Sequence, residues 1–351
     1  MNENLRSLST ATTRVIRHHD EEYLFFGGTA YLGLLYDRAF IDLYKQGLEL
    51  YGLNNGTSRS NNVQIDIYDK AEAEMALRFG FDDCILLSSG YLAAQIVVQA
   101  LSGLGEFLYA PGAHPALWVS GAPLMRDLSF DQWAVITTEY INQSAGNCFV
   151  IVSNSLDNLS PQAFDFSVFN DVDPNKELYF VLDDSHGIGV KGAGSTFVDT
   201  QIIQRENSHV VLVASLAKGM GTDAGAVLCS FVDSSLFRRS TIFTGASPSS
   251  PASMYALLHG AEIFAQRSKL LQEHIFYLDT MLGAKVHRIA NFPVFTVPQQ
   301  GAFKHFKENG ILISSFSYPR SSDPPINRIV LTAAHQKSDL ERLIQVVDVL
   351  C

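Results

Sequence analysis

Two segments of the sequence, residues 179–190 and 210–221, place polar side chains directly after an apolar run. Each run lacks alternation, which is typical of a strand buried on both faces of a parallel sheet. The carboxyl ends of parallel strands lie at one edge, where open α/β sheets bind ligands. We therefore expect one site to contain the polar residues that follow the two runs, which are Asp183, Asp184, His186, Ser215 and Lys218.

Lys218 lies between an apolar run and the glycines Gly219 and Gly221, which would leave room for a ligand. Shielding from water lowers the pKa of an amine and makes it a better nucleophile. A lysine in this setting suits a Schiff base with an aldehyde, and Asp183 on the neighbouring strand could keep a pyridine nitrogen protonated. Most lysines are simply exposed on the surface, so the hypothesis depends on these surroundings.

The spacing of Asp183 and His186 lets both side chains approach one ligand from a single loop. A structural turn explains the same spacing equally well. A metal site would need a third ligand, which the sequence does not identify. We therefore predict no metal.

Three other positions could contact a ligand. The turn of Ser89, Gly90 and Tyr91 follows a predicted strand and precedes a predicted helix, so it forms either a phosphate site or an ordinary N-cap. His114 follows another strand and could stack on a flat ring or have no role. Arg328 could bind a carboxylate with two hydrogen bonds or form a surface salt bridge.

Strand-like runs alternate with segments that can form helices, which predicts an α/β fold with a mostly parallel central sheet. The strand-like runs lie at residues 84–87, 106–110, 149–153, 178–183, 210–215 and 225–229. In addition, a helix is predicted at 69–80 and a long loop at 51–62.

The pattern changes near residue 245. We expect a long amphipathic helix at 250–282, short strands at 294–297, 311–314 and 328–332, and a final helix at 338–350. These elements predict a smaller α+β domain. The expected division is an N-terminal segment, 1–45, that packs with the small domain, a large domain, 46–245, and the small domain, 246–351.

Composition excludes several classes of protein. With 47% hydrophobic and 17% charged residues, the chain can form a sizeable core. Its formal net charge of −11 argues against nucleic-acid binding. The four cysteines are widely spaced, which favours free thiols and a reducing compartment. Because no signal sequence or membrane-spanning run is present, we expect a cytoplasmic protein.

Six stretches of the sequence resemble the α-oxoamine synthases, fold-type I enzymes that use pyridoxal 5′-phosphate (PLP). The stretches occur in the family's order over most of the chain. The resemblance implies the aspartate aminotransferase-like fold of PLP-dependent transferases. The stretches are Tyr31-Leu-Gly-Leu, Ser58-Arg59, Leu87-Ser-Ser-Gly-Tyr-Leu-Ala, Leu182-Asp-Asp-Ser-His-Gly-Ile-Gly-Val, Ser215-Leu-Ala-Lys-Gly-Met-Gly and Leu331-Thr-Ala-Ala-His.

The resemblance implies a role for each matched residue. Lys218 would bond covalently to PLP, Asp183 would pair with the ring nitrogen, and His186 would reach the ring hydroxyl. His114 would stack on the ring, and Arg328 would bind the carboxylate of the amino acid. The phosphate would be held by Ser89, Gly90, Tyr91 and Ser215, with Thr244 supplied by the partner subunit.

The resemblance further implies a homodimer with its active site at the subunit interface. Its activity would be the condensation of a small amino acid with an acyl-CoA, with loss of CO₂ in decarboxylating members. Transamination, or a catalytically silent binding protein, remain alternatives, because several residues on the substrate side differ from the family pattern. The differences are at Thr29 and Ala30, where the family usually has Asn, at Tyr68, where it has His, and in residues 53–57 and 153–158.

Overall fold

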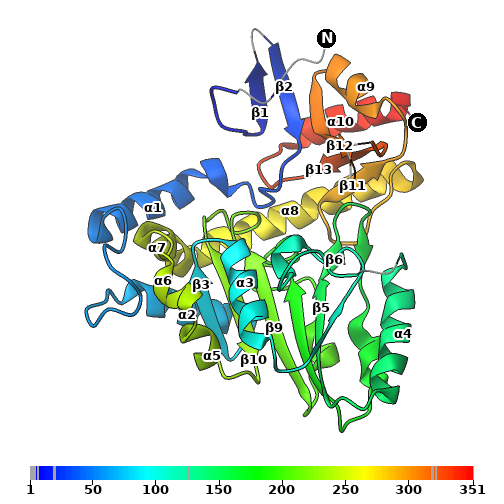
Figure 1. Cartoon of the computed structure of the whole chain (residues 1–351). Coiled ribbons are helices and arrows are strands. Elements are labelled where there is room, and N and C mark those ends of the chain that lie inside the picture. The colour runs from blue at the N-terminus through cyan, green and yellow to red at the C-terminus, as the bar shows by residue number, and fades with distance from the viewer. Residues whose placement is uncertain are drawn as a thin grey trace.

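The computed structural model of the chain describes residues 5, 8–18, 21–124, 127–317, 320 and 322–350. A six-stranded sheet with the order β3-β10-β9-β8-β5-β4 forms its centre (Figure 1). All neighbouring pairs are parallel except those of β10, which confirms the predicted mostly parallel sheet. The strands are β3 Asp83–Leu87, β4 Glu106–Tyr109, β5 Cys148–Asn154, β8 Glu177–Asp183, β9 Ser208–Ser215 and β10 Gly225–Ser230.

Helices cover both faces of this sheet, which explains why its strands are apolar without alternation. Val150 and Val152 of β5 pack in one core cluster with α3. Phe149 and Ile151 of the same strand point the other way, into a second cluster with α4. The helices of this part are α1 Arg38–Tyr51, α2 Ile67–Phe79, α3 Gly90–Leu101, α4 Phe130–Gln143, α5 Ser235–Arg238 and α6 Thr241–Gly245.

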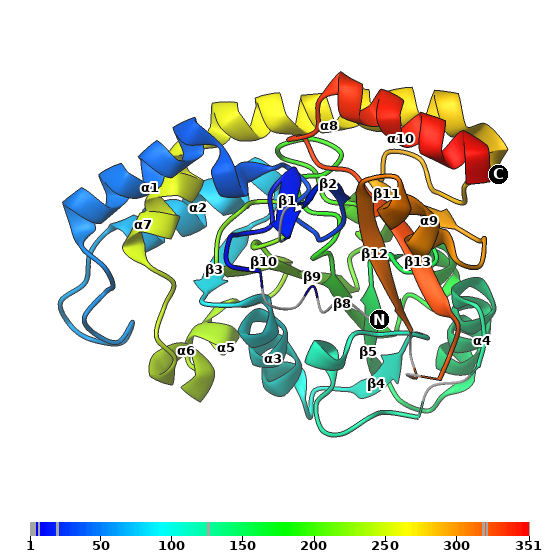
Figure 2. The ribbon, with the colours of Figure 1, turned by 90° about the horizontal axis from the view of Figure 1, so that it is seen from above.

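A five-stranded sheet with the order β1-β2-β12-β13-β11 joins the two ends of the chain, because β2 pairs in parallel with β12. In Figure 2, α8 and α10 lie side by side along one edge of the molecule. The predicted domain boundaries at residues 45 and 245 remain predictions. The elements are β1 Val15–His18, β2 Glu21–Phe26, β11 Val294–Val297, β12 Ile311–Ser317, β13 Pro325–Val330, α7 Pro251–His259, α8 Ala261–Leu282, α9 Ala302–Glu308 and α10 Lys337–Leu350.

The single helix predicted at 250–282 is wrong, because the chain forms α7 and α8 with a break at Gly260. Glycine is a poor helix former. A Cβ at this position would lie 2.6 Å from the Ala256 carbonyl oxygen and 2.8 Å from the Phe264 ring. The break lets α7 pack against α1 and α2, while α8 packs against α10, the helix that follows the last strand of the small sheet.

The strand predicted at 328–332 begins and ends earlier, as β13. After Val330 the chain turns, and the Thr332 N–H donates to Nδ1 of His335 at 3.0 Å. His335 also stacks on Phe26 with a centroid distance of 4.1 Å. Nearby, the Ala333 N–H donates to the Tyr31 carbonyl at 2.8 Å. This turn therefore connects the end of the small sheet to the loop that follows β2.

Three of the four cysteines, Cys84, Cys148 and Cys229, are free thiols, as expected, and Cys351 lies outside the described residues. In the described part of the chain, none of the helices has both the length and the apolar character needed to cross a bilayer.

A buried ion network holds the loop after α1 against the large sheet. Glu72 of α2 is 3% exposed and accepts hydrogen bonds from Arg59 at 3.2 Å and from Arg238 at 2.8 Å. Its carboxylate also accepts the Leu86 N–H of β3 at 3.0 Å. Since three elements meet at this side chain, Glu72 is a structural residue, and the Ser58-Arg59 stretch helps to hold the loop in place.

We expect Glu72→Ala to reduce the free energy of unfolding by roughly 3–5 kcal/mol, because two guanidinium groups would lose a buried partner. Chemical denaturation followed by circular dichroism measures this change. Lys70→Ala on the same helix is the control and should change stability by less than about 0.5 kcal/mol, since its ion pair with Asp66 is exposed. Equal effects of the two substitutions would contradict the structural role of Glu72.

Candidate active site

Lys218 and His186 meet beyond the ends of two neighbouring strands. β8 and β9 are parallel and end at Asp183 and Ser215. The turns that follow them place Nζ of Lys218 3.1 Å from Nε2 of His186. The structure thus brings together residues from both of the segments that the sequence predicts to form one site.

Two further side chains hold the His186 ring. The Tyr31 hydroxyl lies 2.7 Å from Nδ1, and the Asn158 amide nitrogen lies 2.9 Å from Nε2. Because Asn158 and Lys218 both donate to Nε2, the ring proton lies on Nδ1 and is donated to the Tyr31 oxygen. Tyr31 is fully buried, which fixes the position of the ring.

Burial determines the charge of this pair. It lowers the pKa of His186 well below its ordinary value, and the charges of Lys218 and Arg328 lower it further. The ring is therefore neutral at physiological pH. Burial also lowers the pKa of the Lys218 amine, while the nearby Asp183 carboxylate acts in the opposite direction. A lowered pKa increases the uncharged, nucleophilic fraction of the amine.

The two adjacent aspartates have different surroundings. Asp183 is half-buried, and its charge acts on Lys218. Asp184 is fully buried and accepts hydrogen bonds from the Ser155 hydroxyl and the Phe197 N–H. Burial raises the pKa of Asp184 to about 7. Asp183 can therefore interact with a ligand, whereas Asp184 holds the loop that follows β8.

The N-terminus of α3 packs directly against the end of β9. Ser89 is the N-cap of α3, and its hydroxyl accepts the Leu92 N–H at 3.2 Å. A Cβ on Gly90 would lie only 2.6 Å from Cβ of Ser215, so the close approach requires glycine. A helix N-terminus with hydroxyl groups beside it can bind a phosphate. The turn is an N-cap, and its position also suits the predicted phosphate site.

Among the described residues, Tyr91, His114 and Thr244 form no hydrogen bond with Lys218 or His186. Tyr91 is exposed at the start of α3. His114 is exposed, but its charge lowers the pKa of His186, so the two rings are near each other. Thr244 lies in α6, where its carbonyl oxygen accepts the Ser58 hydroxyl at 2.7 Å. Ring stacking by His114 and phosphate binding by Tyr91 and Thr244 remain predictions.

Arg328 is buried in β13, between β11 and β12, and is only 5% exposed. Its guanidinium carbon lies 5.8 Å from the centroid of the Phe316 ring. Within the described part of the chain, Nε and Nη2 of Arg328 have no hydrogen-bond partner. This position excludes a surface salt bridge. Because an unpaired buried cation is unfavourable, these N–H groups suit an anionic group brought by a ligand.

Tyr31 and Asn158 contact His186, although sequence reasoning assigned neither a role. The only sequence signal for Tyr31 is its place in a stretch that matches the family. The only signal for Asn158 is its place in segment 153–158, which differs from the family pattern. Asp157, in the same segment, is half-buried, and Arg328 lowers its pKa while burial raises it. The divergent segment therefore contributes two polar side chains to the site.

No family model matches the sequence. Curated relatives nevertheless align with nearly all of it. The 8-amino-7-oxononanoate synthase of Vibrio parahaemolyticus is 24% identical, with 98% of this chain and 92% of the relative covered. The enzyme of the same name from Yersinia pseudotuberculosis is 27% identical, with 97% and 92% covered.

Solved structures with a similar fold carry the same enzyme name or that of a second enzyme. The serine palmitoyltransferase of Sphingomonas wittichii superposes with a TM-score of 0.83 at 16% identity, covering 98% of this chain and 91% of that one. The 8-amino-7-oxononanoate synthase of Francisella tularensis gives 0.70 at 18% identity, covering 93% and 97%. The chain is thus similar in sequence to 8-amino-7-oxononanoate synthases. Its fold is the expected fold of PLP-dependent transferases, which the likeness to the solved structures confirms.

The residues of this site fit PLP. Lys218 offers a half-buried amine with a lowered pKa, and Asp183 places a carboxylate near it. The contact between Gly90 and Ser215 forms a narrow cradle at a helix N-terminus, which suits a phosphate. A serine palmitoyltransferase of the same fold was solved with PLP.

We expect Tyr31→Phe to lower the free energy of unfolding by about 1–3 kcal/mol, because the buried His186 ring would lose its partner at Nδ1. Thermal and chemical denaturation measure the change. Tyr140→Phe is a matched control, since the Tyr140 hydroxyl bonds Glu106 on the surface, and it should change stability by less than about 0.5 kcal/mol. A Tyr31→Phe protein as stable as the control would exclude the proposed bond to His186.

Proposed function

We propose that this chain is a PLP-dependent acyltransferase that condenses a small amino acid with an acyl-CoA. The main support is the half-buried Lys218 amine, which contacts His186 and lies near Asp183. The curated relatives named above are 8-amino-7-oxononanoate synthases, and their alignment with nearly the whole chain supports the same type of reaction. A cytoplasmic location remains our expectation.

PLP, when bound, withdraws electrons from the amino acid so that its Cα proton becomes acidic. In the proposed roles, Asp183 favours the protonated ring nitrogen and neutral His186 positions the ring. Arg328 binds the carboxylate of the amino acid through its unpaired N–H groups. The Lys218 amine, freed when the amine of the amino acid takes its place, would in its uncharged form accept the Cα proton.

We also propose a homodimer in which α6 of one subunit reaches the site of the other. In this arrangement, Thr244 contacts the phosphate that Ser89, Gly90, Tyr91 and Ser215 hold. A cavity between residues 54–58 and 245–248 lies beside Thr244, and it is the surface that we expect near the partner. Light scattering of the purified protein tests the assembly.

We predict that borohydride will fix PLP to Lys218. Peptide mapping by mass spectrometry should find the label on this residue, and Lys218→Ala should lose both the label and the visible absorption of the bound cofactor. Lys191→Ala is the control, because the pKa of Lys191 is also lowered by burial but its amine donates to the Phe197 carbonyl. Labelling of another lysine would refute the assignment.

Product analysis separates the possible reactions. We expect free CoA to be released when PLP, an amino acid and an acyl-CoA are all present. A keto acid formed without CoA release would indicate transamination. A protein that binds PLP at Lys218 but forms neither product would be a binding protein. Glycine, alanine, serine and threonine, titrated in turn, identify the amino acid by the spectral change.

We predict that Arg328→Ala will weaken amino-acid binding on the order of 10- to 100-fold, because charge-assisted hydrogen bonds to a carboxylate would be lost. The cofactor absorption should remain. Spectral titration measures the dissociation constant, with Arg17→Ala, an exposed arginine of β1, as the control. Loss of the cofactor absorption in Arg328→Ala would instead mean that Arg328 supports the fold of the site.

A further inference from the structure

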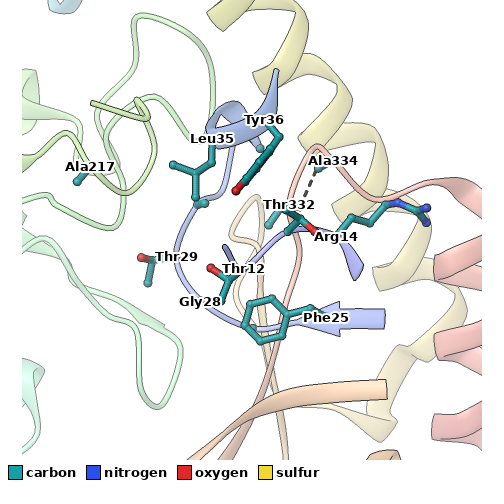
Figure 3. A pocket seen from close by; sticks show the side chains of 14 residues that line it. Thr12, Arg14, Phe25, Gly28, Thr29, Leu35, Tyr36, Ala217, Thr332 and Ala334 are labelled. Atoms are coloured by element: carbon teal, nitrogen blue, oxygen red, sulfur yellow. Dashed lines mark hydrogen bonds between the residues drawn. The ribbon is translucent and has the colours of Figure 1, made fainter. Parts of the chain in front are cut away.

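A cavity of about 350 Å³ lies next to the candidate active site (Figure 3). Ala217, which precedes Lys218, forms part of its wall, and Ala30, which precedes Tyr31, forms another part. The cavity therefore borders the two segments whose side chains meet at His186. Its volume is at the lower end of the range of roughly 300–1,000 Å³ that is common for small-molecule pockets.

Close backbone contacts fix two segments of the cavity wall relative to each other. Gly33 packs so closely on the following turn that a Cβ would lie 2.7 Å from the Ala334 nitrogen. The hydrogen bond from the Ala333 N–H to the Tyr31 carbonyl fixes the same contact. Because most of the described residues on either side are small or apolar, none of their side chains fills the space between them. The cavity is thus a fixed feature of the fold.

The charge of the cavity is the decisive observation. Among the described residues that line it, Arg14 is the only charged one. Nη1 of Arg14 donates to both carboxylate oxygens of Asp339, at 2.7 and 2.8 Å. Asp339 is itself 4% exposed and also accepts the Gln336 N–H at 2.7 Å. In Figure 3, the Arg14 guanidinium extends away from Leu35, Thr29 and Ala217.

We infer that this cavity holds the acyl chain of the substrate and that it selects an uncharged chain. The inference rests on the proposed function and specifies its acyl substrate. The surface beside Lys218 is apolar and hydroxylic, with Leu35, Tyr36 and Thr29 on the wall. An acyl chain that ended in a carboxylate would meet no free cation among the described residues of the wall, since Asp339 already pairs with Arg14. Burying such an unpaired carboxylate is strongly unfavourable.

Matched acyl-CoA pairs test this selection. Hexanoyl-CoA and adipoyl-CoA have the same chain length and differ in the terminal carboxylate. With PLP and the preferred amino acid, CoA release should give a kcat/KM on the order of tenfold or more higher for hexanoyl-CoA. Calorimetric titration of the two acyl-CoAs should show the same preference in binding. Equal use of both, or a preference for adipoyl-CoA, would overturn the inference while leaving the proposed function intact.

A substitution in the wall tests the location. Thr29→Trp should raise the KM for hexanoyl-CoA on the order of tenfold while changing that for acetyl-CoA much less, because the longer chain must share the cavity with the indole. Labelling of Lys218 with PLP should be unchanged. Thr280→Trp, at an exposed position of α8, is the matched control. Equal effects on the two acyl-CoAs, in a folded Thr29→Trp protein that is labelled at Lys218, would show that the acyl chain does not bind here.

A charge substitution tests the role of the ion pair. Asp339→Asn frees the Arg14 guanidinium, so the preference for hexanoyl-CoA should shrink several-fold, and the double variant Arg14→Gln/Asp339→Asn should restore it. An unchanged preference in a folded Asp339→Asn protein would contradict the charge argument. Absence of CoA release from every acyl-CoA, in protein labelled at Lys218, would refute the proposed function and this inference together.

Discussion

The half-buried contact between the Lys218 amine and the His186 ring is the interaction on which the site depends. Removal from water lowers the pKa of both groups, so the amine becomes more nucleophilic and the imidazole stays neutral. This effect requires two parallel strands that end side by side. It also requires the buried Tyr31 from the N-terminal loop, whose hydroxyl holds the His186 ring in position at Nδ1.

The position of Tyr31 depends in turn on the small sheet. The parallel pairing of β2 with β12 brings the N-terminal segment to the C-terminal strands. The turn after β13 then holds the loop through the Ala333 to Tyr31 hydrogen bond and through the stacking of His335 on Phe26. Burial lowers the pKa of His335 to about 4, so the stacked ring is neutral at physiological pH. The last matched stretch, Leu331 to His335, therefore stabilises the site and also lines the cavity beside it through Thr332 and Ala334.

The differences from the family pattern have distinct structural settings. Tyr68, in place of a histidine, is buried beneath the Arg59 guanidinium and donates its hydroxyl hydrogen to the Ser249 carbonyl at 2.8 Å. This residue supports packing. Thr29 and Ala30, in place of an asparagine, line the cavity beside Lys218. The change at these two positions therefore affects the surface that we assign to the acyl chain.

The sequence by itself determined the strands of the large sheet and the residues that follow β8 and β9, because apolar runs and glycines are local signals. It did not predict the break at Gly260, since the helical pattern continues across that glycine and the contacts of α7 with α1 and α2 are not visible in the local sequence. The tertiary structure buried Arg328 so that, among the described residues, its Nε and Nη2 have no hydrogen-bond partner. It also decided the contacts of Tyr31 and Asn158 with His186 and the pairing of Arg14 with Asp339. Each joins residues far apart in the chain, and sequence spacing does not determine which distant side chains meet.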